Sequence, residues 1–234
     1  MKLRGRRECA DCGARWSYFE TGAVECPDCG SVRSVALDGE AALHTAGHAE
    51  LDLSGARRAV DADEPIRRVA EHAVEACRRF LNRRGFVDAG ELRPLDGRTV
   101  AAAELRAAAD RLRRSMAHDE AAEWYLLALL RGAEAGERPD EVPPGLEPAR
   151  GLGIAGAVER YRADLARYLD EHPDTDARRV LGSLRDRLRR VEALDGDVPP
   201  AEAERLLGAA RGIGEYLRGD EAALARAEGR LGRR

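Results

Sequence analysis

The sequence predicts a small metal-stabilised β module followed by an all-α helical bundle. Two C-x-x-C pairs lie within the first thirty residues, where they can hold a metal ion together. From Pro65 onward, apolar residues recur at i, i+3, i+4 and i+7, which is the period of an α-helix. The chain has 234 residues, enough for one or two domains. We therefore expect a metal module at 1–37, a linker at 38–62 and a helical domain at 63–234.

Four of the five cysteines define the first element. They form the pairs Cys9–Cys12 and Cys26–Cys29, and a glycine follows each pair, as a tight turn requires. Two such turns on adjacent hairpins bring four sulfurs into a tetrahedron, and thiolates select zinc or iron over hard cations. A disulfide and a redox C-x-x-C remain as alternatives, although the first is disfavoured in the cytoplasm and the second needs only one pair. We predict a structural Zn²⁺ site with four cysteine ligands.

Residues 20–32 read Glu-Thr-Gly-Ala-Val-Glu-Cys-Pro-Asp-Cys-Gly-Ser-Val. This run resembles the second hairpin of the zinc ribbon of archaeal and eukaryotic transcription factor B. The resemblance covers residues 7–37 and implies a three-stranded ribbon with Cys9, Cys12, Cys26 and Cys29 as the ligands. The whole chain is similar to uncharacterised archaeal proteins that carry such a ribbon ahead of a helical body. The resemblance thus implies a small β zinc ribbon followed by an all-α helical bundle, with the ribbon as a recognition module linked to transcription machinery.

Three aromatic residues cluster in the first hairpin, at Trp16, Tyr18 and Phe19. On a strand, Trp16 and Tyr18 share one face and Phe19 points to the other. A ribbon of this size cannot bury both faces, so either the helical body or a partner must cover one of them. We interpret Trp16 and Tyr18 as partner-binding residues, because exposed Trp and Tyr anchor interfaces, and place Phe19 near the metal cluster.

The linker at 38–62 has weak periodicity, with one short strand expected at Leu51-Asp-Leu53. His44 and His48 lie four residues apart, but Gly47 stands between them and no carboxylate or cysteine pattern accompanies them. A second metal site is therefore not expected there.

The helical domain begins at Pro65, with Asp63 or Glu64 as the cap and Gly85 at the end of the first helix. Cys77 falls on the apolar stripe of this helix, so we interpret it as a core residue. Further helices are expected at 99–116, 119–133, 154–171, 176–194, 200–217 and 220–231. The helix at 119–133 has no polar face and should be central. Prolines mark a loop at 136–150, which offers a division into two subdomains.

Two glycine motifs in the helical domain match patterns that occur at functional sites. Gly151, Gly153 and Gly156 spell GxGxxG, but no strand precedes them, as a dinucleotide-binding turn requires. Gly208 and Gly212 spell GxxxG, which allows two helices to approach closely. We interpret both motifs as packing features.

The sequence favours a non-enzymatic, cytoplasmic protein that binds nucleic acid weakly at most. The formal net charge is −4, and residues 1–37 carry six basic and five acidic residues, so nucleic-acid binding should be weak at most. The apolar runs are too short for a membrane helix and no signal peptide is recognisable, so we expect a cytoplasmic protein. No catalytic set emerges, because the histidines are dispersed along the chain: His44, His48, His72, His118 and His172. The expected role is recognition of a protein partner; the alternative is a helical interaction scaffold in which zinc is only a structural staple.

Overall fold

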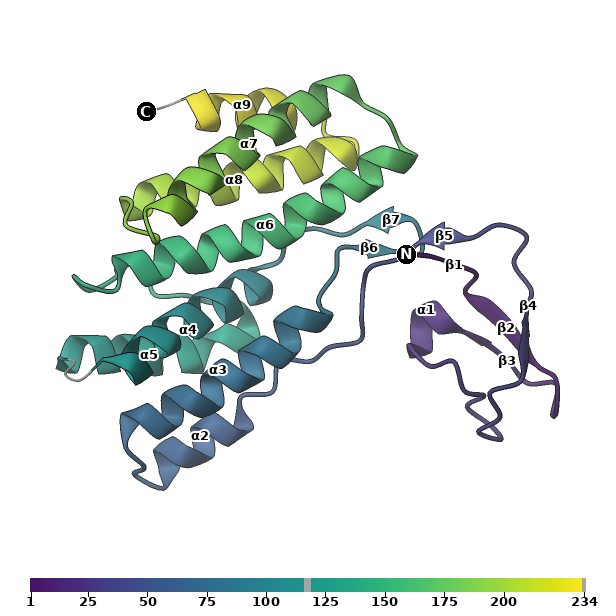
Figure 1. The fold of residues 1–234 in the computed structure, drawn as a ribbon, viewed down its shortest axis with the longest axis horizontal. Coiled ribbons are helices and arrows are strands. Elements are labelled where there is room, and N and C mark those ends of the chain that lie inside the picture. Colours follow the sequence, from purple (N-terminus) through teal and green to yellow (C-terminus); the bar gives the residue numbers. More distant parts are fainter. Residues whose placement is uncertain (116–118, 233–234) are drawn as a thin grey trace.

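The computed structural model describes residues 1–115 and 119–232 and contains a small β region joined to a helical body (Figure 1). The predicted end of the 99–116 helix and His118 fall on residues outside those described. We refer to residues 6–36 as the cysteine module and to residues 54–232 as the helical body. The cysteine module projects to one side of the body, with the start of the chain at the junction between them.

The cysteine module is built on a three-stranded antiparallel sheet. Its strands are β2 (Arg6–Cys9), β3 (Arg15–Ser17) and β4 (Ser34–Ala36), in the order β3-β2-β4. Arg7 pairs with Trp16 on one side and with Ala36 on the other. A single helical turn, α1 (Tyr18–Thr21), follows β3 directly. The second edge strand, β4, has no neighbour on its outer side within the described chain.

Two short strand pairs form the junction between the module and the body. The first joins β1 (Lys2–Leu3) to β5 (Ala42–Leu43), and the second is the hairpin of β6 (Val87–Asp88) and β7 (Glu91–Leu92). The side chain of Thr45 lies between this hairpin and the body. Its hydroxyl donates to the buried carboxylate of Asp164 (2.6 Å) and accepts from the backbone N–H of Val87 (3.0 Å).

The prediction of a linker at 38–62 needs correction, because its second half belongs to the body. Leu51 and Leu53 are buried there without forming a strand, since no other strand lies beside them. The helix α2 (Ser54–Asp61) follows and packs on α3. Its first turn is held by Glu134, whose carboxylate accepts from the backbone N–H of Leu53 and from Arg57. Eight residues are too few to show a clear helical period in the sequence.

In the described part of the body seven longer helices follow, and each was expected from the periodicity. They are α3 (Ile66–Arg83), α4 (Gly97–Arg114), α5 (Glu120–Gly132), α6 (Glu147–Glu171), α7 (Thr175–Ala193), α8 (Pro200–Leu217) and α9 (Ala223–Gly232). Aspartates cap three of them: Asp96, Asp119 and Asp174 each accept a backbone N–H of the first turn. Neither Asp63 nor Glu64 caps α3; the position before it is Pro65.

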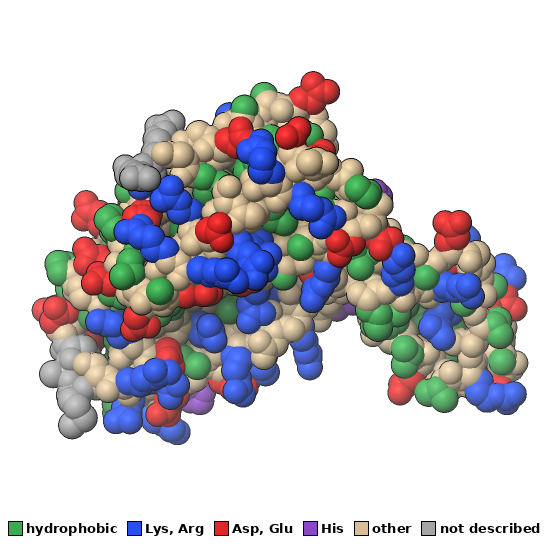
Figure 2. Space-filling view, turned by 45° about the horizontal axis from the view of Figure 1, so that its top comes forward, with side chains coloured by type: hydrophobic (Ala, Val, Ile, Leu, Met, Phe, Trp, Pro, Cys, Tyr) green, Lys and Arg blue, Asp and Glu red, His purple; other side chains and the backbone are tan. Residues whose placement is uncertain are grey.

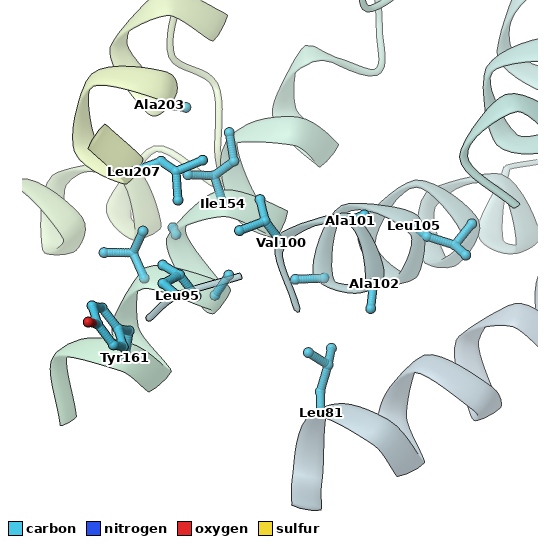
Figure 3. Packing of buried hydrophobic residues seen from close by; sticks show 14 of the residues in the cluster. Leu81, Leu95, Val100, Ala101, Ala102, Leu105, Ile154, Tyr161, Ala203 and Leu207 are labelled. Carbon is cyan, nitrogen blue, oxygen red and sulfur yellow. The ribbon is translucent and has the colours of Figure 1, made fainter. Parts of the chain in front are cut away.

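The central helix is α6, not the helix at 119–133 as predicted. Helix α6 runs between α4 and the pair α7 and α8, and it packs on all three (Figure 1). Its residues Ile154 and Tyr161 lie among core side chains of α4 and α8, including Leu207 (Figure 3). By contrast, α5 packs mainly on α4 and leaves Trp124 60% exposed. The uniform apolar character of α5 therefore does not correspond to burial on every side.

The proline-rich loop is shorter than predicted, because α6 begins at Glu147. Pro148 lies in the first helical turn, where its missing N–H leaves no bond unmade. One continuous cluster of buried side chains runs through α2 to α9, so this loop does not separate two cores.

A buried ionic network ties the loop to the helices. Glu104 of α4 is fully buried and accepts from Arg150 (2.9 Å), from Arg138 (2.8 Å) and from the hydroxyl of Tyr125. Arg150 also donates to the carbonyl oxygens of Pro139 and Asp140 in the loop. Because every charge has a partner, the ion pairs and hydrogen bonds offset the cost of removing these groups from water.

Candidate metal centre

The four cysteine sulfurs of the module converge on one point. All four Sγ atoms lie within 4.8 Å of one another, and no disulfide joins them. The separations between Cys9 and Cys29 and between Cys12 and Cys26 are both 3.6 Å. A tetrahedral ion with metal–sulfur bonds of about 2.3 Å requires sulfurs about 3.8 Å apart. The predicted ligands therefore form a cluster that could hold one metal ion.

Two turns of the same construction position the sulfurs. In the first, the N–H of Gly13 donates to the carbonyl oxygen of Cys9 (3.0 Å); in the second, the N–H of Gly30 donates to that of Cys26 (2.9 Å). Both glycines have left-handed backbone, with φ of +77° and +74°. A Cβ at either position would meet no atom within 4 Å, so conformation and not space requires glycine there.

The thiols influence one another's ionisation. Backbone N–H groups of Cys12 and Asp11 that point at the Cys9 sulfur lower the pKa of Cys9 to about 7. The N–H of Ala14 lowers the pKa of Cys12 in the same way, but the three neighbouring sulfurs and burial raise it overall, to about 12. Four thiolates cannot coexist at this distance without a cation, so the cluster is suited to a metal that supplies the compensating charge.

Trp16 belongs to the interior of the cysteine module, which corrects the prediction of a partner-binding residue. Only 8% of its surface is exposed, and it packs with Cys9 and Cys26 in the module's small core. Its indole N–H donates to the carbonyl oxygen of Ala23 (3.1 Å). With so few apolar residues in the module, Trp16 is needed beneath the metal site and is not available to a partner.

Tyr18 and Phe19 point to the junction, because β3 ends at Ser17 and the chain turns into α1. The centroid of the half-buried Phe19 ring lies 4.9 Å from the centroid of the His44 imidazole, and that of the Tyr18 ring lies 6.0 Å from it. Gly5 leaves the space for Phe19, since an added Cβ would overlap its ring. The prediction that Phe19 packs near the metal cluster is therefore wrong, because this side of the module faces the junction at His44 and His48.

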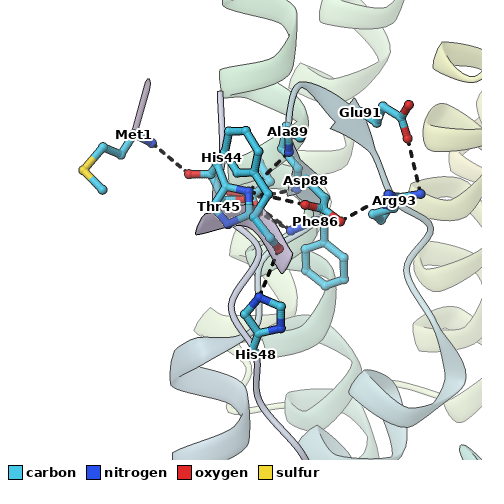
Figure 4. Close-up of polar contacts among 12 residues, drawn as sticks. Met1, His44, Thr45, His48, Phe86, Asp88, Ala89, Glu91 and Arg93 are labelled. Carbon is cyan, nitrogen blue, oxygen red and sulfur yellow. Dashed lines mark hydrogen bonds and ion pairs between the residues drawn. The ribbon is translucent and has the colours of Figure 1, made fainter. Parts of the chain in front are cut away.

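His44 connects the module to the β6–β7 hairpin (Figure 4). The side chain is 7% exposed, and its Nδ1 accepts from the backbone N–H of Ala89 (3.2 Å), with Asp88 3.5 Å away. Because Nδ1 accepts a hydrogen bond, it carries no proton and the imidazole is neutral. Burial lowers the pKa of His44, and the negative charge of Asp88 partly opposes this. The Nε2 atom of the second histidine, His48, contacts the carbonyl oxygen of Phe19 (3.0 Å). The two histidines therefore serve the junction.

The exposed apolar residues of the module lie elsewhere and were not predicted. Most of the large hydrophobic side chains exposed on the described chain belong to this module and its immediate continuation: Val24, Val32, Val35 and Leu37. Val32 is 68% exposed and Val35, on the open edge strand β4, is 55% exposed. Hydrophobic side chains are visible on the surface of the smaller lobe (Figure 2). Single valines in a short segment do not predict an exposed surface from sequence, whereas a cluster of aromatic residues suggests a binding surface.

The remaining sequence motifs have structural roles in the helical body. Gly151 and Gly153 lie inside α6, where a Cβ would strike the backbone of Gly196 and of Glu104. Gly212 approaches α9 in the same way, as the GxxxG interpretation expects. Cys77 is fully buried in α3, and desolvation raises the pKa of its thiol to about 12.

The fold and the site together define a protein with a small cysteine-clustered β module joined to a helical body. Within residues 1–115 and 119–232, the four cysteines form the only cluster of metal-ligating side chains. No helix in these same residues has both the length and the apolar character to cross a membrane. The chain belongs to DUF7117, a family of unknown function whose model matches residues 1–231. No curated protein and no solved structure matches it.

Proposed function

We propose that the chain is a non-enzymatic zinc protein whose cysteine module recognises a protein partner. Four thiolates at tetrahedral spacing suit Zn²⁺, with iron as the alternative. A site filled by four cysteines has no open position for substrate or water, so the metal would stabilise the module and not react.

The observation that carries this proposal is the position of the apolar side chains. The side of the module that bears Phe19 faces the junction, whereas Val24, Val32 and Val35 are exposed. Exposed apolar groups on so small a unit are costly unless another surface covers them, and β4 adds a free strand edge. The partner surface would therefore lie along residues 24–37, in place of Trp16 and Tyr18.

Transcription machinery is the partner class that the resemblance of residues 20–32 favours. The near-neutral charge of the module argues against strong binding to nucleic acid itself. A protein subunit of such machinery is thus a better candidate than its DNA or RNA.

Affinity capture from native lysate with three forms of the chain tests the proposal. The wild type and Leu194→Ser, which removes an exposed leucine of the helical body, should both retain transcription-complex subunits. The double variant Val32→Ser/Val35→Ser should lose them while binding zinc normally. Retention by the double variant would contradict the proposed surface.

The alternative is a helical scaffold in which zinc is a structural staple. The contacts at His44 support it, because they fix the module against the body as part of one structure. In that case the double variant Val32→Ser/Val35→Ser should retain every partner, and variants with substitutions on the helical body should lose them.

A further inference from the structure

An open trough with a volume of about 1060 Å³ lies on the described surface of the helical body. It is lined by α4, by α3 and α6, which both pack on α4, and by the end of α7 with the connection that follows it. Basic side chains gather in the middle of the helical body (Figure 2). The trough is far from the cysteine cluster in sequence and shares no residue with it.

Small residues keep the trough open. Ala107 of α4 and Ala155 and Gly156 of α6 line it, and a Cβ added at Gly156 would meet no atom within 4 Å. The space is therefore not filled by neighbouring side chains. Its size is near the upper end of the range of small-molecule sites, which is roughly 300–1000 Å³.

Charged residues of both signs line the trough, but most of its carboxylates are already neutralised. The ion pairs are Glu71 with Arg68, Glu75 with Arg78 and Arg79, and Asp110 with Arg113 and Arg114. The side chains of two lining arginines, Arg106 and Arg111, make no hydrogen bond or ion pair with any described residue. The free positive charge of the trough therefore lies on α4.

A second cation close to Arg106 makes this arrangement more unusual. Arg160 of α6 donates to the carbonyl oxygen of Leu81 at the end of α3 (2.8 Å) and has no carboxylate partner. Burial, and then the charge of Arg106, lower the pKa of Arg160. Arg160 does not itself line the trough, but its charge and that of Arg106 on the neighbouring helix repel each other, and an anion bound at Arg106 would reduce this repulsion.

We propose that the trough binds a small polyvalent oxyanion, a ligand carrying phosphate or carboxylate groups, through Arg106 and Arg111. Guanidinium groups bind both kinds of oxyanion with paired N–H donors. Glu192 of α7 and Asp195, which follows α7, also line the trough, and their side chains make no ion pair with a described residue, so they repel an anion and favour its binding at the arginines of α4. This site is independent of the proposed recognition module, and the Val32→Ser/Val35→Ser variant should retain it.

Isothermal titration at physiological salt tests the site with pyrophosphate, ATP and citrate, and with adenosine as the uncharged comparison. The wild type should bind at least one of the three anions and not adenosine. Pyrophosphate or ATP without citrate would assign phosphate as the group recognised, and citrate without the other two would assign carboxylate. Arg106→Gln should weaken binding by about ten- to a hundredfold, as loss of a charge-assisted hydrogen bond does.

Two further variants make the result specific. Arg131→Gln removes an exposed, unpaired arginine of α5 outside the trough and should bind like the wild type. Asp195→Asn removes a negative charge at the trough, at a position whose left-handed backbone asparagine tolerates, and should tighten binding. Equal weakening in Arg106→Gln and Arg131→Gln, weaker binding in Asp195→Asn, or binding of an oligonucleotide in place of all three small anions would overturn the proposal.

Discussion

Removal of the metal should unfold the cysteine module and leave the helical body folded. The buried hydrophobic residues of the module are only Cys9, Trp16 and Cys26, too few to stabilise it without a metal. In zinc-finger peptides a structural zinc contributes about 10–16 kcal/mol to folding, which is more than such a core can replace. The body, in contrast, has a continuous core through α2 to α9.

The magnitude of the expected spectroscopic change follows from the structure. The only helix of the module, α1, has 4 residues, whereas α6 alone has 25. Far-ultraviolet circular dichroism of the helices should therefore hardly change when a chelator is added. Tryptophan emission should change strongly, because Trp16 passes from 8% exposure to full exposure.

The assay uses the variant Trp124→Phe, which leaves Trp16 as the sole tryptophan. Chelator titration should shift its emission to the red while one zinc per chain is released. Cys26→Ser in the same background should show the shifted emission without chelator, and Cys77→Ser should behave like its parent. If the helical signal collapses with metal loss, the body does not fold independently; if the Trp16 emission stays unchanged, the cysteines do not hold a structural metal.

Three further predictions concern the body and the junction. Glu104→Ala should lower the free energy of unfolding by about 3–5 kcal/mol, because it leaves Arg150 buried without its carboxylate. Urea titration measures this loss, and Glu204→Ala, which removes a half-exposed carboxylate, should have a smaller effect. Cys77, whose raised pKa is about 12, should resist a thiol reagent at pH 8 in the native protein and react in urea. The pKa of His44 is lower in the folded protein than in the unfolded chain, so the unfolded chain binds a proton at this residue more readily. The free energy of unfolding should therefore fall as the pH drops through the unfolded pKa of about 6.5. His44→Asn, which can still accept from Ala89, should reduce this loss of melting temperature between pH 7 and 5; an unchanged pH profile would contradict the assignment.

The metal ligands and most helices could be predicted because their determinants are local. A C-x-x-C turn brings two sulfurs together within four residues, so its spacing alone specifies the chemistry. The predicted helices at 176–194 and 200–217 correspond to Thr175–Ala193 and Pro200–Leu217, since an apolar stripe of five turns fixes both ends closely. For such elements the sequence contains nearly all of the information.

The aromatic residues could not be placed, because their position depends on where one strand ends. Alternation along a strand puts Trp16 and Tyr18 on one face only if the strand continues through both. The strand stops at Ser17, and α1 turns Tyr18 and Phe19 toward His44, a residue that sequence reasoning assigned to a linker. The same limit applies to α5, whose apolar sequence does not reveal that Trp124 stays 60% exposed.

The junction also bears on how recognition by the module could reach the body. The chain enters the module after β1 and leaves it before β5, and these two strands pair with each other, so the module is a loop closed at its base. On the body side, Thr45 links this base to Asp164 of the central helix α6, and His44 links it to the β6–β7 hairpin. The junction also contains an ion pair between Lys2 and Glu171 of α6, the ring contacts of Tyr18 and Phe19 with His44, and Leu43, which packs against the core of the body. A partner that binds along residues 24–37 would therefore be coupled to the body through this closed base, whose contacts reach the core helix α6 at Asp164 and Glu171.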